Sequence, residues 1–146
     1  MSSASVNMLN PNCQNNITGV HKNLTIYYSH PIKTYNSEQE KHAIELLQKR
    51  FRKFRIVNPK DYRFSGMQDY LELAAKCSIL AYHNDQNGQI TKGVALERLF
   101  AFMLEIPIYK IGSRITKESI HVISYSEGIL SDHDYAIINQ ILEGLP

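Results

Sequence analysis

The chain has 146 residues, of which 43% are hydrophobic. This length and composition suffice for one compact domain with its own core, and the length leaves little room for a second domain. Sixteen Lys and Arg residues oppose fourteen Asp and Glu residues, so the formal net charge is +2 and gives no reason to expect a nucleic-acid partner. The two cysteines, Cys13 and Cys77, lack zinc-site or disulfide spacing, and no apolar run approaches the roughly 20 residues of a membrane span, so we expect a reduced, cytoplasmic protein.

Residues 1–22 are rich in Ser and Asn, lack periodicity and contain Pro11 and Gly19. This composition predicts a flexible N-terminal leader. From Leu24 onward, short apolar runs alternate with amphipathic segments, which is the pattern of βαβ units around a mainly parallel sheet. We therefore expect residues 23–146 to form a single α/β domain.

The predicted strands are short apolar runs at residues 24–28, 55–59, 78–83, 106–111 and 120–125. The predicted helices are amphipathic segments at residues 37–54, 67–77 and 131–145. A further helix carries Glu97 and has Thr91 as its N-cap. Ser37 begins the first helix, and Glu40 three residues later completes the spacing of a capping box.

This order of elements predicts a three-layer, flavodoxin-like or Rossmann-like α/β domain with a five-stranded, mainly parallel sheet. In such sheets, ligands bind beyond the carboxyl ends of the strands, at the point where the strand order reverses. That rule directs attention to residues 27–33, 58–69 and 83–97.

Glu97 is an unusual residue because it lies inside an otherwise apolar helix. On a helical wheel it falls on the border between the packed face and water. In one interpretation, Glu97, Arg98 and Glu105 form a narrow solvated stripe. In the other, the carboxylate of Glu97 faces a ligand at the strand ends, where burial raises its pKa and the nearby helix N-terminus lowers it.

Four segments, taken in order and spacing, bear on this choice: LTIYYSHPI (24–32), VNPKDY (57–62), MQDYLELAAKCSILAYH (67–83) and TKGVALERLFAFMLEIPIYKI (91–111). Together they resemble the nucleoside 2′-deoxyribosyltransferase family and its relatives, the deoxynucleoside 5′-monophosphate N-glycosidases. The resemblance implies a flavodoxin-like domain that breaks or transfers the N-glycosidic bond of a nucleoside or nucleotide without a cofactor.

The resemblance also implies roles for particular residues. Glu97, at the end of the Gly93-x-x-x-Glu97 run, is similar to the family's nucleophile. Asp69 occupies the place of an aspartate that protonates the leaving base, and Tyr27 that of a tyrosine lining the site. Thr91 stands where the nucleotide-cleaving members have a hydroxyl that touches the phosphate.

These residue types suit the chemistry. Breaking the C1′–N bond builds positive charge on the sugar, which a carboxylate can stabilise or attack. A second acid can protonate the base, and a phenol can hold the nucleophile. Lys33 and Lys92 are candidates to bind a phosphate near helix N-termini. The chain departs from the family at His30, where the first turn often has glycine, and at Arg98, where small residues are usual.

Other patterns favour structural explanations. His83, Asp85, His133 and Asp134 lack recognised ligand spacing, so we expect no metal site. The basic run at residues 49–54 ends a helix, where cations complement the helix dipole.

Two alternatives to a nucleoside- or nucleotide-cleaving enzyme stay open from sequence. One is a non-catalytic module that binds or senses a nucleotide. The other is a glycohydrolase of nicotinamide dinucleotides, which fold analogy alone suggests. The family resemblance further implies a homo-oligomer, a dimer or larger, in which residues 125–146 are candidates to complete a neighbour's site.

Overall fold

The computed structural model describes residues 24–118 and 132–144. The predicted leader at residues 1–22 and the predicted strand at residues 120–125 lie outside the described residues. None of the described helices combines the length and the apolar character needed to cross a bilayer.

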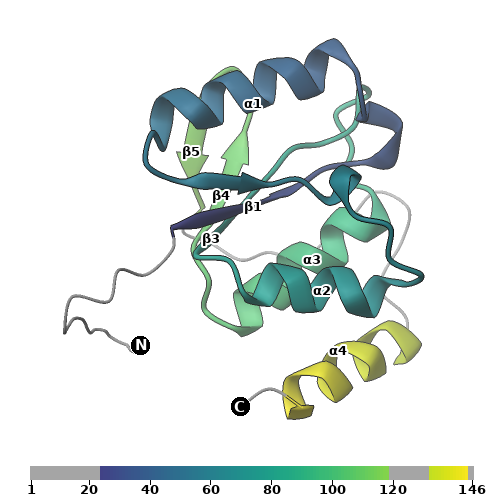
Figure 1. Cartoon of the computed structure of the whole chain (residues 1–146). Coiled ribbons are helices and arrows are strands. Elements are labelled where there is room, and N and C mark those ends of the chain that lie inside the picture. The colour runs from purple at the N-terminus through teal and green to yellow at the C-terminus, as the bar shows by residue number, and fades with distance from the viewer. Residues whose placement is uncertain (1–23, 119–131, 145–146) are drawn as a thin grey trace, which may run out of the picture.

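Five strands form one sheet in the order β2-β1-β3-β4-β5 (Figure 1). They are β1 (Thr25–Ser29), β2 (Arg55–Val57), β3 (Ile79–Tyr82), β4 (Ile108–Ile111) and β5 (Ile115–Lys117). The pairs β1–β2, β1–β3 and β3–β4 are parallel, and β4–β5 is antiparallel. The predicted fold class, an α/β domain with a five-stranded and mostly parallel sheet, is therefore confirmed.

The fifth strand of the sheet is not the one expected from sequence. Residues 112–114 make a tight turn after β4, closed by a 2.9 Å hydrogen bond from the Gly112 amide to the Arg114 carbonyl. The chain then returns along β4 as β5, with Ile115 opposite Ile111. A strand of three residues is too short to show the alternation by which strands are recognised in a sequence.

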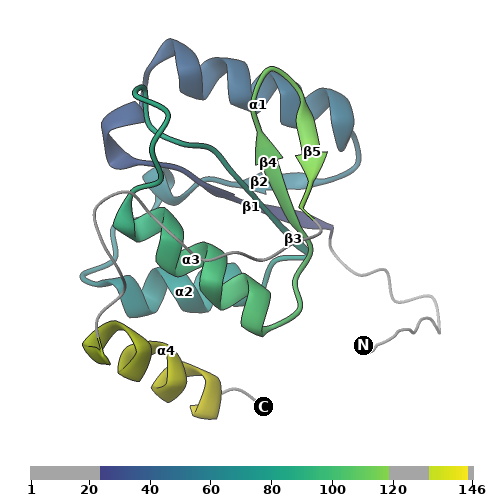
Figure 2. The same ribbon diagram turned by 180° about the vertical axis from the view of Figure 1, so that it is seen from behind.

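Four α-helices surround the sheet: α1 (Glu38–Arg50), α2 (Met67–Ala75), α3 (Lys92–Met103) and α4 (Asp132–Gly144). Helix α1 covers one face, α2 and α3 cover the other, and α4 packs outside α2 and α3 (Figures 1 and 2). Two 3-10 turns, at Ile32–Thr34 and Pro59–Asp61, follow β1 and β2 and precede the next elements. Both turns lie at the carboxyl ends of their strands.

The residues at helix ends explain where the helices begin and stop. The Ser37 hydroxyl accepts a hydrogen bond from the Glu40 amide, as a capping residue does, at 3.2 Å. The Glu40 carboxylate instead accepts from the Asn36 amide, one residue before the cap. Helix α1 ends at Arg50, four residues earlier than predicted, because Phe51 leaves the helical conformation and the chain turns into β2.

Side-chain alternation in β1 decides what faces each helix layer. Tyr27 belongs to the core beneath α2 and α3, whereas Ile26 and Tyr28 belong to the core beneath α1. Helix α3 is enclosed by the sheet on one side and by α2 and α4 on the other, so its residues 94–101 are all buried. Any charged residue in that stretch must therefore find partners inside the protein.

Candidate functional site

A cavity of about 410 Å³ opens at the carboxyl ends of β1 and β3, within the size range of small-molecule sites. From β1 the chain adds β2 on one side and β3 on the other, so this is the place where the strand order reverses. The cavity wall is built from the loops after β1, β2 and β3 and from the first turns of α2 and α3. Its residues are His30, Pro31, Ile32, Lys33, Tyr35, Pro59, Lys60, Tyr62, Met67, Tyr70, Asp85, Thr91, Gly93, Val94 and Glu97.

Glu97 reaches the cavity from the second turn of α3 and is only 6% exposed. Its two carboxylate oxygens each accept a hydrogen bond from β1: the Tyr27 hydroxyl donates to Oε2, and the Ser29 hydroxyl donates to Oε1 at 2.6 Å. Arg98 is also buried, and only Glu105 is exposed. The solvated-stripe interpretation of these three residues is therefore wrong.

Strand geometry explains why both hydroxyls reach the same carboxylate. Tyr27 and Ser29 are two residues apart in β1, so their side chains point to the same face of the sheet, the face covered by α3. Tyr27 is fully buried and supports Glu97 from below rather than forming the cavity wall. Ser29 was missed from sequence, although its two-residue spacing from Tyr27 is the signal that finds it.

Burial dominates the titration of Glu97. Desolvation raises the pKa of its carboxyl to about 7, although the hydrogen bonds from Ser29 and Tyr27 oppose the rise. Burial, together with the charge of Glu97, also raises the pKa of the Tyr27 phenol, so that this group stays a proton donor. The carboxyl of Glu97 thus changes charge near neutral pH, where a group can either donate or accept a proton.

The first turn of α3 forms the cavity wall next to Glu97. Thr91 occupies the predicted N-cap position, but its hydroxyl makes no capping hydrogen bond. A Cβ atom on Gly93 would lie 3.4 Å from the terminal methyl of Met67, which is an ordinary van der Waals contact, so α2 and α3 pack against each other at this point. The wall therefore presents a hydroxyl that makes no capping bond, next to the N-terminal amides of a 12-residue helix.

The lysines separate into two groups. Lys33 is exposed on the cavity rim, and Lys60 lines the cavity while its ammonium lies 2.8 Å from Glu40. Lys92 does not line the cavity, because its ammonium points to Asp134 on α4 at 3.3 Å. Of the two lysines expected from sequence, only Lys33 can meet a ligand in this cavity.

The structure does not bring Asp69 into the cavity wall. Asp69 is exposed on the first turn of α2, while Met67 and Tyr70 on either side of it do line the cavity. Besides Glu97, the carboxylate residue that lines the cavity is Asp85, in the loop after β3. One of its oxygens accepts hydrogen bonds of 2.9 Å from the amides of Asn87 and Gln89, which fixes the loop.

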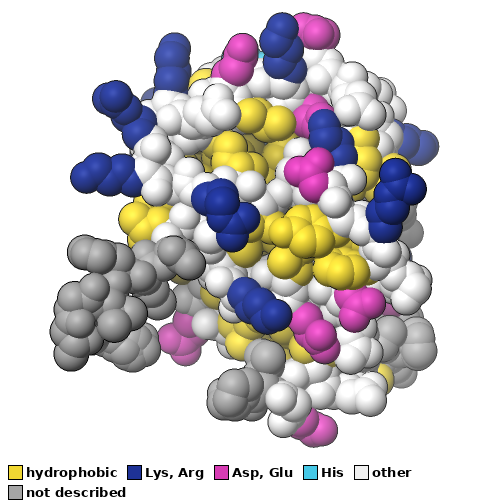
Figure 3. Space-filling view, viewed as in Figure 1, with side chains coloured by type: hydrophobic (Ala, Val, Ile, Leu, Met, Phe, Trp, Pro, Cys, Tyr) yellow, Lys and Arg dark blue, Asp and Glu magenta, His cyan; other side chains and the backbone are white. Residues whose placement is uncertain are grey.

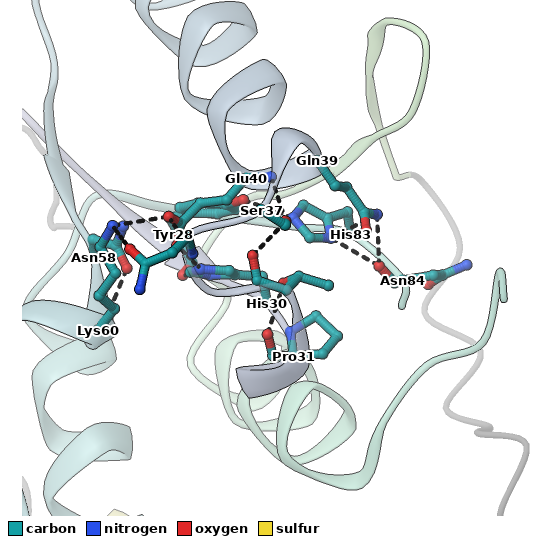
Figure 4. A network of polar contacts seen from close by, with 12 residues as sticks. Tyr28, His30, Pro31, Ser37, Gln39, Glu40, Asn58, Lys60, His83 and Asn84 are labelled. Carbon is teal, nitrogen blue, oxygen red and sulfur yellow. Dashed lines mark hydrogen bonds and ion pairs between the residues drawn. The ribbon is translucent and has the colours of Figure 1, made fainter. Parts of the chain in front are cut away.

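His30 closes the base of the cavity through the polar network in Figure 4. Its Nδ1 donates to the Tyr28 carbonyl at 3.0 Å, and its Nε2 lies 2.8 Å from the Glu40 carboxylate. Its ring stacks on Tyr28 with centroids 3.7 Å apart. Burial lowers the pKa of His30, although the bonds to Glu40 and Tyr28 favour its protonated form. These contacts hold His30 in a fixed position in the cavity wall.

Glu40 is the centre of this network. Burial opposes its ionisation, but hydrogen bonds from Lys60, His30 and the Asn36 amide outweigh that effect and lower the pKa of its carboxyl to about 2. These three partners come from the loops after β2 and β1 and from the turn before α1. One buried carboxylate thus ties together three segments of the cavity wall.

Arg98 lies next to Glu97 in sequence but outside the cavity. Its Nε donates to the Glu118 carboxylate at 2.9 Å, and its guanidinium lies 5.3 Å from the ring centre of Tyr82. The Tyr82 hydroxyl donates to the other oxygen of Glu118 at 2.9 Å. Arg98 is therefore held in a partly buried ion pair outside the cavity and does not narrow it.

Within residues 24–118 and the described part of α4, no group of three or more His, Cys, Asp or Glu side chains is arranged to hold a metal ion. Asp85 lines the cavity, His83 bonds to Tyr28, and Asp134 pairs with Lys92, so these residues are dispersed. The side chain of His133 lies outside the described residues.

Comparisons of the chain with models of protein families, with curated proteins and with solved structures gave no match. The resemblance to the deoxyribosyltransferases thus depends on the quoted segments alone, and what it implies about activity stays a hypothesis.

Proposed function

We propose that the chain cleaves or transfers the N-glycosidic bond of a nucleoside or nucleoside 5′-monophosphate, with Glu97 as the nucleophile. The observation that supports this proposal most strongly is the setting of Glu97. A buried carboxylate lines a cavity at the strand-order reversal, and two hydroxyls from one strand fix its orientation. A carboxylate at such a site suits a reaction that builds positive charge on a sugar.

In the proposed reaction, a carboxylate oxygen of Glu97 forms a bond to C1′ while the C1′–N bond breaks. The electron pair of that bond stays on the base nitrogen, which takes a proton from an acid. Water or a second base then attacks C1′ and gives a proton back to that acid, while the C1′–O bond breaks and its electron pair returns to the Glu97 carboxylate. Tyr27 and Ser29 donate to the carboxylate throughout, so the leaving carboxylate of the second step is stabilised by the same two hydrogen bonds.

Asp85 is the better placed of the two candidate acids, because it lines the cavity and Asp69 does not. We therefore assign the protonation of the leaving base to Asp85. The family resemblance favours Asp69 for this role. Geometry and resemblance therefore predict opposite effects on turnover when Asp85 and Asp69 are replaced in turn.

The cavity wall offers matching surfaces for the parts of a nucleotide. The rings of Tyr35, Tyr62 and Tyr70 provide flat faces for a base. Lys33 and Thr91 both line the cavity, and Thr91 lies at the N-terminal end of α3, an arrangement that suits a 5′-phosphate. A 5′-monophosphate is accordingly expected to react better than its nucleoside.

The test is to incubate the protein with a panel of nucleosides, their 5′-monophosphates and a nicotinamide dinucleotide, and to follow release of the free base by chromatography. Glu97→Gln should lower kcat by a factor on the order of 10² or more on any confirmed substrate while ligand binding persists. Wild-type turnover by Glu97→Gln would exclude Glu97 as the nucleophile.

The non-catalytic nucleotide-binding module is the second candidate, and one observation favours it. Both oxygens of Glu97 already accept protein hydrogen bonds, and the aspartate that the resemblance implies as the acid is exposed. If neither the wild-type chain nor Glu97→Gln releases a base, but both bind monophosphates with measurable heat in calorimetry, this second function holds.

Assembly and location form part of the proposal. The resemblance implies a homo-oligomer in which residues 125–146 contribute to a neighbouring cavity, and the spacing of the two cysteines favours the reducing cytoplasm. Light scattering coupled to size-exclusion chromatography would detect the dimer, and a monomeric mass with full activity would contradict shared sites.

A further inference from the structure

Cations and carboxylates are unevenly distributed along the chain. Residues 46–60 and 106–117 contain no Asp or Glu, yet they hold more than half of the sixteen Lys and Arg residues. From sequence alone, the first of these segments is explained by the dipole of α1. That explanation does not extend to the second segment, which belongs to a hairpin.

The fold brings the two segments together. The β4–β5 hairpin lies beside α1 (Figure 2), and an Arg50 Nη donates to the Ile115 carbonyl at 3.5 Å. Between them runs an open groove of about 530 Å³. The charged residues that line it are Lys49 and Arg50 from α1 and Arg114 and Lys117 from the hairpin, and no carboxylate lines it among the described residues.

Strand alternation keeps the nearest carboxylate of the hairpin away from the groove. Lys117 is two residues from Ile115, which packs under α1, so both point to the α1 face. Glu118 points to the opposite face, where it bonds to Arg98 and Tyr82. On α1, Glu45 lies in the adjoining hollow with Lys49 and Arg52. The groove therefore keeps a net positive charge.

Two aromatic residues lie just beyond the groove's cations on α1, with one side packed against the core. Phe51 and Phe54 are half-buried within the run Lys49 to Arg55, and the Arg50 guanidinium lies 5.5 Å from the ring centre of Phe51. Lys and Arg side chains project from the upper left edge of Figure 3, the region where α1 ends in Figure 1. A cationic groove bordered by partly exposed rings suits a strand of phosphates with unstacked bases. A run of acidic residues such as polyglutamate offers charge but no flat rings.

We propose that this groove, which we call the α1–β5 groove, binds single-stranded nucleic acid without sequence preference. Phosphates contact the four lining cations, and bases lie against the rings at the end of α1. The groove is separate from the cavity. Helix α1 has 13 residues, beginning at the cavity edge near Glu40, so its far end lies roughly 20 Å away. Binding there does not depend on the proposed glycosidic activity.

The experiment measures fluorescence anisotropy of a labelled 12-nucleotide oligo(dT) with the full chain at 50 and 200 mM salt. The affinity of the wild type should fall as the salt concentration rises. A plot of the logarithm of the binding constant against the logarithm of the salt concentration should fall with a slope of about 0.7 for each phosphate contacted. Lys117→Glu is compared with Lys110→Glu, an exposed lysine on β4 that faces the other side of the sheet. Lys49→Glu is compared with Lys41→Glu, which is exposed about two turns earlier on α1.

Each pair changes the net charge equally, so only position differs. Lys117→Glu and Lys49→Glu should weaken binding at least about fivefold and flatten the salt slope, and the two controls should stay within about twofold of the wild type. Equal losses in test and control variants would overturn the proposal, as would no binding by the wild type at 50 mM salt. Tighter binding of polyglutamate than of oligo(dT) would assign the groove to acidic peptides instead.

Glu97→Gln serves as a further control, because it should bind oligo(dT) as the wild type does. A variant of the cavity rim tests the location directly: if Lys33→Glu loses as much oligo(dT) affinity as Lys117→Glu, the strand occupies the cavity and the α1–β5 groove is not its site. If base release fails while the position-dependent losses are seen, the proposed function falls and the groove stands.

Discussion

Replacing Glu97 by Gln should make the protein more stable at alkaline pH. Glutamine resembles the protonated carboxyl in shape and keeps a hydrogen-bonding acceptor and donor for Tyr27 and Ser29. The pKa of Glu97 is raised from its ordinary value of 4.5 to about 7 by burial, so the folded state binds the proton more tightly than the unfolded state. The stabilisation that comes from protonation of Glu97 is therefore fully present below pH 4.5 and is lost as the pH rises through 7.

The size of the effect follows from the two pKa values. Their difference corresponds to about 3 kcal/mol at pH 8.5, where Glu97 is ionised in both states. At pH 5 the carboxyl is protonated in the folded state, and the difference shrinks to less than about 1 kcal/mol. For a chain of this size, 3 kcal/mol corresponds to a Tm higher by roughly 6 to 12 °C.

The assay is thermal unfolding followed by circular dichroism at pH 5 and pH 8.5, for the wild type, Glu97→Gln and the exposed control Glu45→Gln. Glu97→Gln should gain stability over the wild type only at pH 8.5, and Glu45→Gln should match the wild type at both values. A Glu97→Gln variant that is equally or less stable at pH 8.5 would show that the carboxylate carries no desolvation cost, and the argument from burial would be wrong.

Three further predictions concern neighbouring residues. Glu40→Gln should lower the free energy of unfolding by about 2 to 3 kcal/mol at pH 7, because the pKa of Glu40 is lowered to about 2. Measured by urea unfolding, this difference from the wild type should disappear as the pH falls from 4.5 to 2, and a pH-independent difference would contradict the prediction. Ser29→Ala removes a donor to the Glu97 carboxylate, so the acidic limb of the pH–rate profile should move up by about one pH unit rather than stay in place. Asp85→Asn should lower turnover by about 10² while Asp69→Asn stays within about twofold, and the reverse order would return the acid role to Asp69.

Much of the fold could be predicted because its signals are local. The parallel strands are short runs rich in apolar residues, and the segments between them have the length and pattern of the helices that connect them. The short strand β5 was not predicted because three residues carry no periodicity, and its position depends on the turn at residues 112–114. The end of α1 was placed four residues too late because residues 51–54 continue the helical pattern while the chain already turns.

The site was predicted less evenly, for physical reasons. Glu97 was found because a carboxylate in an apolar helix conflicts with its neighbours, and such conflicts mark functional positions. The direction of Lys92 and the exposure of Asp69 depend on how α2, α3 and α4 pack together. The sequence pattern of a single helix does not predict how that helix packs against its neighbours, so these two features could not be predicted. Asp85 had no special pattern because its role comes from the loop that carries it.

The two buried glutamates of this protein show why Glu97 is the better functional candidate. Glu40 has a lysine partner at 2.8 Å and a histidine at 2.8 Å, so its charge is neutralised and the pKa of its carboxyl is lowered to about 2. Glu97 is as deeply buried, but it has only two neutral hydroxyl donors and no ion-pair partner among the described residues, so its pKa rises to about 7.

A carboxylate kept purely for structure gains by pairing, as Glu40 does. Holding one unpaired beside a cavity costs about 3 kcal/mol of stability above neutral pH. A cost of that size is ordinary at functional sites, where activity needs a charged group that faces a ligand. The positive charge that builds up on a sugar at C1′ would be the ion-pair partner of the Glu97 carboxylate. Because each pKa comes from contacts visible around its own carboxylate, the opposite pH dependences of Glu40→Gln and Glu97→Gln test this comparison within a single molecule.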